Sequence, residues 1–464
     1  MNLATNLPET FYRAVAPVPV EAPKLVARNA ALTAPLGLPE DWFDRSETLA
    51  ALSGNGPFPG QEPVALAYSG HQFGTWVPLL GDGRAHLIAT LETPKGIFEI
   101  QLKGSGATPF SRNGDGRAAL GPMLREYIVS EAMAGFGIPT TRSLAVVTTG
   151  EEVYRRRKEP GGILARVAKS HVRVGTFQFA ASRREGEGLR ALADHELKRS
   201  YSDYPSDDSR FLWLLENAIA RQAKLIAQWM CVGFIHGVMN TDNMAISGET
   251  IDYGPCAFMD VFHPKKVFSS IDEWGRYAWD QQPGIALWNL TRFAECLLPL
   301  LDNDQEKAVV QARTALEKFL PQFEEHFETG MMAKLGIAEK HADDGDFIAA
   351  TLKMLMEKEL DFTLFFRNLT RGEDPGEASW HAAWKERLGG KAPDTDLMAR
   401  SNPIYIPRNH QVEAALKEAE EGNYERFNTL CDLLRTPFVE KLNMVGFEAA
   451  PLAAEEVHAT FCGT

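Results

Sequence analysis

The spacing of apolar residues changes along the chain, and this change limits the folds that the chain can adopt. Residues 97–103, IFEIQLK, alternate between apolar and polar side chains, which is typical of a strand with one face in a core. Residues 212–234 instead repeat large apolar side chains every three to four positions, and the segment from about 270 to 440 continues in this helical pattern. We therefore expect an α+β fold in two lobes, the first mostly β and the second mostly α, with a hinge near 200–212.

Three strands are predicted around two glycine-containing turns. They are WVPLL (76–80), AHLIATLE (85–92) and IFEIQLK (97–103). The segment GDGR (81–84) would form a hairpin turn between the first two strands, since glycine tolerates the backbone angles of tight turns. Lys103 closes the third strand on its polar face, so we expect its side chain to point away from the core.

Composition excludes several classes of function. The formal net charge of -14 and the isoelectric point near 5.4 argue against bulk binding of nucleic acid or of an anionic membrane. No run of 18 or more apolar residues is present, so no membrane span is expected, and the first residues do not resemble a signal peptide. The five cysteines are widely spaced and lack a zinc pattern. We expect a bacterial cytoplasmic enzyme.

A catalytic loop is indicated by HGVMNTDN, which begins at His236, and by the triplet DYG, which begins at Asp252. Asn243 follows the histidine by seven residues, as in the catalytic loop of protein kinases. Asparagine and aspartate oxygens suit Mg²⁺ or Mn²⁺ bound to a triphosphate. The position of the kinase base holds Val238, which cannot accept a proton. Asp242 is the nearest carboxylate that could replace it; the alternative is that Asp242 only caps the loop.

Basic residues suited to phosphate precede this loop. Lys103, followed by Glu126 in a helix predicted over 118–137, matches the kinase pair of phosphate-binding lysine and orienting glutamate. Arg166 and Arg173 could clamp phosphate oxygens in a bidentate manner. Each also has a plainer interpretation: a solvated lysine, a surface carboxylate or a surface salt bridge.

The segment KGSGATPFSRNGDGRA (103–118) contains four glycines. So many glycines among polar residues favour a loop whose backbone approaches a ligand closely. Asp115 and Gly116 lie near its end. GDGR (81–84) alone is a weaker signal of the same kind, because a hairpin turn also explains it.

Several long motifs together resemble the selenoprotein O family of pseudokinases. They are YSGHQFG, GDGRA, QLKGSGATPFSRNGDGRA, LREYIVSEAM and HGVMNTDN…DYG, and the resemblance extends from about residue 60 to the final FCGT. It implies a protein-kinase-like fold that transfers AMP from ATP to Ser, Thr or Tyr hydroxyls of proteins. ATP would bind flipped relative to kinases, so that its α-phosphate meets the acceptor. The missing kinase base then matters less, because the nucleophile approaches another phosphorus from another place.

The resemblance also assigns roles to residues. Asp242 would be the base, and Asn243 and Asp252 would hold Mg²⁺ or Mn²⁺. Lys103, paired with Glu126, would hold the γ-phosphate end together with two arginines. The full set implied to bind the nucleotide is Gly81, Gly83, Arg84, Lys103, Asp115, Gly116, Glu126, Arg166, Arg173 and Asp252. In bacterial members a cysteine near the C-terminus can pair with one beside the DYG triplet, here Cys462 and Cys256, and such a disulfide would be a redox gate.

The expected organisation has four parts. Residues 1–60 form an N-terminal extension, 61–205 the β lobe, 206–440 the helical lobe and 441–464 a tail with Cys462. We expect a monomer that acts on ATP and protein substrates, with UTP as another conceivable donor. Two rival functions stay open: a kinase that transfers the γ-phosphate, and a non-catalytic nucleotide-binding scaffold.

Overall fold

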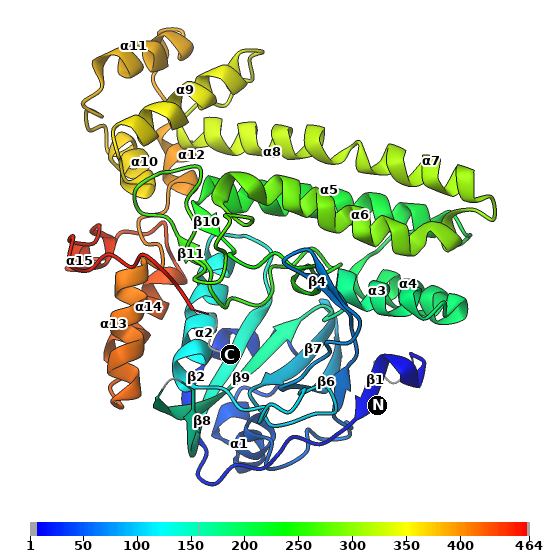
Figure 1. Ribbon diagram of the computed structural model, residues 1–464. Coiled ribbons are helices and arrows are strands. Elements are labelled where there is room, and N and C mark those ends of the chain that lie inside the picture. The colour runs from blue at the N-terminus through cyan, green and yellow to red at the C-terminus, as the bar shows by residue number, and fades with distance from the viewer. Residues whose placement is uncertain (1–6, 156, 462–464) are drawn as a thin grey trace.

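A seven-stranded antiparallel sheet forms one side of the protein (Figure 1). The computed structural model describes residues 7–155 and 157–461. Within these residues the strand order of the sheet is β1-β3-β6-β7-β9-β8-β2. Its strands are β1 (Tyr12–Ala14), β2 (Lys24–Arg28), β3 (Val64–Leu66), β6 (Ala85–Thr93), β7 (Gly96–Lys103), β8 (Arg142–Tyr154) and β9 (Lys158–Ala168). Helices make up most of the remainder, so the fold is α+β as predicted.

The predicted hairpin around GDGR is wrong. Residues 75–77 form β5 (Thr75–Val77), which pairs with β4 (Gly70–Gln72) and not with β6. The chain then runs to β6 without a strand, because Pro78 lacks an N–H donor and Asp82 pairs elsewhere. The backbone N–H of Asp82 donates to the Leu66 carbonyl oxygen at 2.9 Å, and its carboxylate accepts from the Leu66 N–H at 3.1 Å. The predicted hairpin of β6 and β7 is present, with Ala85 opposite Lys103.

The first 60 residues are joined to the sheet more closely than an extension would be. β1 pairs with β3, and β2 pairs with β8 at the sheet edge. The helix α1 (Ser46–Ser53) packs against β8 and β9. The two short strands were missed because each is only three to five residues long, too short to show a clear alternation.

The helix predicted over 118–137 is α2 (Leu120–Gly135), which lies against the sheet. The helix ends at Gly135, and Gly137 follows with a φ of 75°, a left-handed conformation that is common just after a helix. Two helices from the end of the chain, α13 (Asn409–Glu420) and α14 (Glu425–Leu434), cover the other side of α2 (Figure 1). Residues far apart in sequence therefore enclose the helix that carries Glu126.

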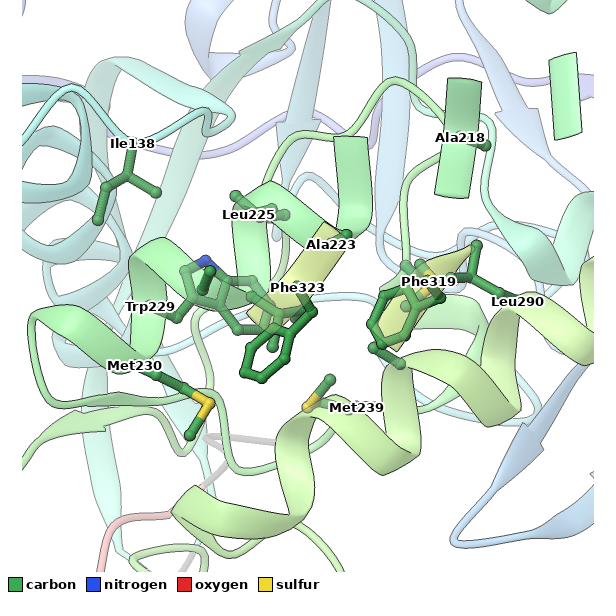
Figure 2. Packing of buried hydrophobic residues seen from close by; sticks show 14 of the residues in the cluster. Ile138, Ala218, Ala223, Leu225, Trp229, Met230, Met239, Leu290, Phe319 and Phe323 are labelled. Carbon is green, nitrogen blue, oxygen red and sulfur yellow. The ribbon is translucent and has the colours of Figure 1, made fainter. Parts of the chain in front are cut away.

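Long helices stack above the sheet in Figure 1. Side chains of α5, including Leu225 and Trp229, pack with Phe319 and Phe323 of α8 and with Leu290 of α6 (Figure 2). This apolar packing holds the helical side together. The helices are α3 (Val174–Ser182), α4 (Gly186–Ser200), α5 (Arg210–Cys231), α6 (Gln282–Leu301), α7 (Gln305–Leu316), α8 (Phe319–Lys334), α9 (Asp344–Glu357), α10 (Phe362–Thr370), α11 (Ala378–Arg387), α12 (Thr395–Ser401) and α15 (Val445–Glu448).

The change from strands to helices comes earlier than the expected hinge at 200–212. It follows β9, and α3 and α4 pack against α6 and α5 on the helical side. None of the helices in the described residues is both long and apolar enough to cross a membrane.

Candidate active site

The end of β7 places Lys103 in a buried ion pair. Its Nζ donates to Glu126 Oε2 at 2.6 Å and to Asp252 Oδ1 at 3.0 Å. Lys103 and Glu126 are both buried, so neither is the exposed surface residue of the plainer interpretation. The sheet and α2 thus bring together the two residues that the sequence singled out as a pair.

Two arginines converge on the same aspartate. Arg166 lies on β9, next to β7 in the sheet, and its Nη1 contacts Asp252 Oδ1 at 2.7 Å and Glu126 Oε1 at 3.2 Å. Arg173 stands just before α3, and its Nη1 contacts Asp252 Oδ2 at 2.9 Å. The chain turns from strand to helix between the two arginines, and this turn brings them together.

Asp252 is held as an anion by these cations. Burial by itself would raise the pKa of Asp252, but Lys103, Arg166 and Arg173 outweigh it and hold this pKa well below its usual range. Its backbone has a φ of 64°, a left-handed conformation that is uncommon for a residue other than glycine. Such backbone angles are concentrated at functional sites.

Three further residues of this cluster were missed in the sequence. Gln101 Oε1 accepts from Arg166 Nη2 at 2.6 Å, and its Nε2 donates to Asp82 Oδ2 at 2.9 Å. Asp82 lies 3.8 Å from Arg173, whose guanidinium stacks over the Tyr68 ring at 4.7 Å. Burial raises the pKa of Asp82 to about 6. Two features of the sequence could have identified these residues. Gln101 shares the polar strand face with Lys103, and Asp82 lies between two glycines.

The loop that contains the HGVMNTDN motif is closed at its base by two short paired strands, β10 (Phe234–Ile235) and β11 (Ala257–Phe258). His236 is a buried structural residue whose Nε2 pairs with the Ile251 carbonyl oxygen at 2.9 Å. The carbonyl oxygen of Val238 accepts from Asn243 Nδ2 at 2.9 Å. This bond uses the amide nitrogen of Asn243, and the role of its Oδ1 as a metal ligand stays a prediction.

Asp242 lies directly beside the cluster of cations. Its backbone oxygen accepts from Arg173 Nη1 at 2.9 Å. Of its carboxylate oxygens, Oδ2 has a weak contact with Gln72 Nε2 at 3.5 Å, and Oδ1 is buried without a hydrogen-bond partner. Burial raises the pKa of Asp242 to about 6, although Arg173 acts in the opposite direction. A partly desolvated carboxylate with an unused oxygen is suited to accept a proton.

The donor set fits a divalent metal that also binds a nucleotide. Asn243 Oδ1, the unpartnered oxygen of Asp242 and the carboxylate of Asp252 are hard oxygen donors. Across the described part of the chain, no group of three or more His, Cys, Asp or Glu residues could hold a metal ion by itself. A site with few protein ligands is typical of Mg²⁺, which is usually completed by phosphate oxygens and water.

The predicted glycines allow two loops to pack together. A Cβ on Gly81, whose φ is 79°, would lie 2.4 Å from the Phe110 ring, and one on Gly83 would lie 2.9 Å from the Phe110 carbonyl oxygen. Gly116 packs against Gly106 in the same way, since a Cβ on Gly116 would lie 2.1 Å from the Gly106 carbonyl carbon. The Arg84 carbonyl oxygen accepts from Gly104 N at 2.7 Å, which places this loop beside Lys103. Contacts of these residues with a nucleotide stay a prediction.

Asp115 is not part of the buried cluster. Its exposed carboxylate pairs with Arg155 at 2.9 Å, at the tip of the hairpin between β8 and β9. Oδ1 of Asp115 also accepts from the Arg117 N–H at 2.9 Å. A role of Asp115 and Gly116 in binding the nucleotide stays a prediction.

The cysteine beside the DYG triplet is inaccessible. Cys256 is a buried free thiol, and burial raises its pKa to about 12. The tail returns to this place, because Thr460 Oγ1 donates to the Pro255 carbonyl oxygen at 2.5 Å. Cys462 lies outside the described residues, so the predicted pairing stays a prediction.

Comparison with known proteins matches this chain along nearly its full length. The family described as "Protein adenylyltransferase SelO" matches residues 2–435. A protein of Brevibacillus brevis named "Protein nucleotidyltransferase YdiU" is 52% identical over 478 residues, covering 100% of this chain and 97% of its own length. Proteins of the same name from Rhodopseudomonas palustris and Halalkalibacterium halodurans are each 51% identical, covering 100% and 99% of this chain and 98% and 96% of their own lengths.

Proposed function

Since the chain belongs to the SelO family and is a nucleotidyltransferase, we propose that it transfers AMP from ATP to Ser, Thr or Tyr hydroxyls of proteins. The fold that supports this activity would be the two-lobed protein-kinase type, with the sheet as the first lobe. The protein would act as a monomer in the bacterial cytoplasm, and UTP would be a second conceivable donor.

The observation that carries the proposal is the convergence of Lys103, Arg166 and Arg173 on Asp252. Buried cations require anions nearby. Glu126 pairs with Lys103 and Arg166, whereas Asp252 is shared by all three cations and is also a proposed metal ligand. If Asp252 binds a divalent metal, a further anion is favoured beside the three cations. A triphosphate supplies it, so the cluster is suited to the β- and γ-phosphates of a nucleotide.

The end of the triphosphate that binds at this cluster determines which phosphorus atom the acceptor attacks. With the γ-phosphate end at Lys103, Arg166 and Arg173, the α-phosphorus lies toward Asp242. The acceptor oxygen forms a bond to the α-phosphorus, and the bond from that phosphorus to the bridging oxygen of pyrophosphate breaks. Asp242 takes the hydroxyl proton, and the cations stabilise the charge that develops on pyrophosphate.

Asn243 and Asp252 would hold Mg²⁺ or Mn²⁺, which supplies neutralising charge to the triphosphate. The chain itself supplies the rest: Asn243 is oriented by the Val238 carbonyl oxygen, and Glu126 orients Lys103. A disulfide between Cys256 and Cys462 would tie the tail over this loop and could regulate access.

The test is incubation of the purified protein with metal, a protein mixture and ATP labelled at either the α- or the γ-phosphate. Covalent α-label that is absent with Asp252→Ala supports AMP transfer. Covalent γ-label alone would establish a kinase and overturn the proposal. Absence of both labels, with ATP still bound, would favour a nucleotide-binding scaffold.

A further inference from the structure

A small hairpin is fastened to the loop that carries Asp242. The His71 N–H donates to Thr241 Oγ1 at 2.7 Å, and the Phe73 N–H donates to Asn240 Oδ1 at 2.9 Å. This hairpin is formed by β4 and β5, which are not part of the large sheet. A Cβ on Gly70 would lie 2.7 Å from Asp242 Oδ1, so the hairpin packs directly on the proposed base.

The opposite face of the hairpin presents aromatic side chains. His71 is paired across the strands with Trp76, and their ring centroids are 5.0 Å apart. Because side chains alternate along a strand, His71 points away from the face on which Gly70 and Gln72 meet Asp242. The His71 ring also meets Trp288 of α6 edge to face at 5.2 Å. Trp76 is 38% exposed, which is unusual for the residue type with the largest apolar surface.

Two arginines flank Trp288. The guanidinium carbons of Arg276 and Arg292 lie 5.1 and 5.2 Å from its ring centroid. Arg292 is paired with Glu295 at 2.6 Å. Within residues 7–155 and 157–461, the Arg276 guanidinium makes no ion pair with a carboxylate, and its Nε is buried without a hydrogen-bond partner. Asp272 accepts only from the backbone N–H of Arg276, at 2.9 Å, and the guanidinium lies against the rings of Tyr277 and Trp288. The structure therefore places a guanidinium without an ion pair here, in a chain whose net charge is -14.

Arg276 is also held close to the catalytic loop. The next residue, Tyr277, donates its hydroxyl to Asn240 Oδ1 at 2.7 Å. A Cβ on Gly74, at the hairpin turn, would lie 3.7 Å from the Arg276 guanidinium. The guanidinium thus lies between the hairpin turn and Trp288 of α6, and the neighbouring Tyr277 links this segment to the loop of Asp242. Among the described residues, no contact joins the guanidinium to Lys103, Arg166 or Arg173.

We propose that His71, Trp76, Arg276, Trp288 and Arg292 form an acceptor-docking surface that binds the polypeptide flanking the modified hydroxyl and selects an acidic residue there. This inference rests on the proposed transfer to protein acceptors. An extended peptide advances about 3.3 Å per residue, so an acidic side chain a few positions from a hydroxyl at Asp242 can reach Arg276. Charge complementarity identifies the occupant: the unpaired guanidinium takes a carboxylate, and Trp76 and Trp288 pack against neighbouring side chains.

The experiment measures binding of fluorescein-labelled peptides that contain one Ser flanked by Glu, by Gln or by Lys residues. Fluorescence anisotropy is recorded for the full-length protein and for Arg276→Ala, Arg276→Lys, Trp76→Ala and, as a control, Arg157→Ala at the exposed hairpin tip. We expect the Glu-flanked peptide to bind about tenfold more tightly than the Gln-flanked one. Arg276→Ala should abolish this preference, Arg276→Lys should restore part of it, and Arg157→Ala should retain it.

The dissociation constant for ATP is measured on the same variants and should not change. Equal affinity for the three peptides, or a preference that persists in Arg276→Ala, would overturn the docking surface. A weaker affinity for ATP in Arg276→Ala would also overturn it, by assigning Arg276 to the nucleotide. Transfer of α-label to the peptides, run in parallel, tests the proposed function separately, since acid-selective binding without transfer would contradict only the chemistry.

Discussion

The two ends of the polar face of β7 are both buried and charged, yet they differ in how their charges are compensated. At one end, Glu99 accepts from His171 Nδ1 at 2.7 Å and contacts Arg199 Nη2 at 3.0 Å. Burial would raise the pKa of Glu99, but Arg199 and His171 outweigh it and lower this pKa to about 2. The carboxylate and its cation satisfy each other, and this end needs no ligand.

At the other end, Lys103 shares Asp252 with Arg166 and Arg173, and the group borders the loop of Asp242 and Asn243. Here the compensating carboxylate is itself a candidate metal ligand. The comparison teaches that burial of charge alone does not mark a site. A functional site is indicated where several buried cations share one carboxylate that can also bind a metal. When the metal binds, the charge of those cations is less fully compensated.

The largest expected effect comes from Asp252. Replacement by alanine should lower kcat/KM for AMP transfer by about a thousandfold, because the proposed metal ligand is lost. Lys103, Arg166 and Arg173 stay in place, so ATP should still raise the Tm of this variant. Radiolabel transfer and a thermal shift assay measure the two effects. If activity were retained, Asp252 would be as purely structural as Glu99.

Removal of the divalent metal should reproduce this loss without unfolding the protein. The described core is held by apolar packing and ion pairs, so EDTA should abolish transfer and change the Tm little. Addition of Mg²⁺ or Mn²⁺ should restore activity. Unfolding on chelation would indicate a structural metal instead.

Glu99→Gln should affect stability and not chemistry. Loss of the carboxylate leaves Arg199 as a buried, uncompensated cation, which costs about 3–5 kcal/mol in the free energy of unfolding. Urea denaturation measures this cost, and kcat per folded molecule should stay within about twofold. A selective loss of kcat would show that the two ends of β7 are coupled.

Glu196 should make the free energy of unfolding depend on pH. Burial raises the pKa of Glu196 to about 7, although Ser170 donates to it at 2.6 Å. Because the folded pKa exceeds the unfolded one, this contribution to stability is present below pH 4.5 and is lost as pH rises through 7. The difference in unfolding free energy between the native protein and Glu196→Gln should change by up to about 3 kcal/mol over this range. A flat difference would mean that Glu196 is not protonated in the fold.

The smallest effect on stability is expected at Asp115. Its pair with Arg155 is exposed, so Asp115→Asn should change the free energy of unfolding by less than about 1 kcal/mol. If Asp115 contacts the nucleotide as predicted, the dissociation constant for ATP should nevertheless rise about fivefold. Isothermal titration with ATP checks this, and an unchanged constant would remove Asp115 from the site.

Much of the architecture was predictable from local pattern. The helix α2, the hairpin of β6 and β7, and the long helix α5 follow from apolar spacing and from glycines at their ends. Of the strand predicted at 76–80, only the first two residues lie in a strand, β5, which pairs with the short strand β4 and not with β6. β4 also contacts the loop that carries Asp242. The strands β1 and β2 were not predicted, because segments of three to five residues are too short to show a clear alternation of apolar and polar side chains.

The sequence by itself determined which residues could bear the chemistry. Lys103, Glu126, Arg166, Arg173, Asp242, Asn243 and Asp252 were all identified from motif order and spacing. The type and order of residues within a short motif determine which side chains could bind a metal or a phosphate, and both can be read directly from the sequence.

Only the tertiary structure decided how the charges are shared. The meeting of β7, β9, α2 and the 236–256 loop places three cations on Asp252 and recruits Gln101 and Asp82 beside them. It also left the Arg276 guanidinium without an ion pair among the described residues, since Asp272 contacts only its backbone N–H. Electrostatic energy depends on distances and burial between residues far apart in sequence, and no local pattern contains those distances.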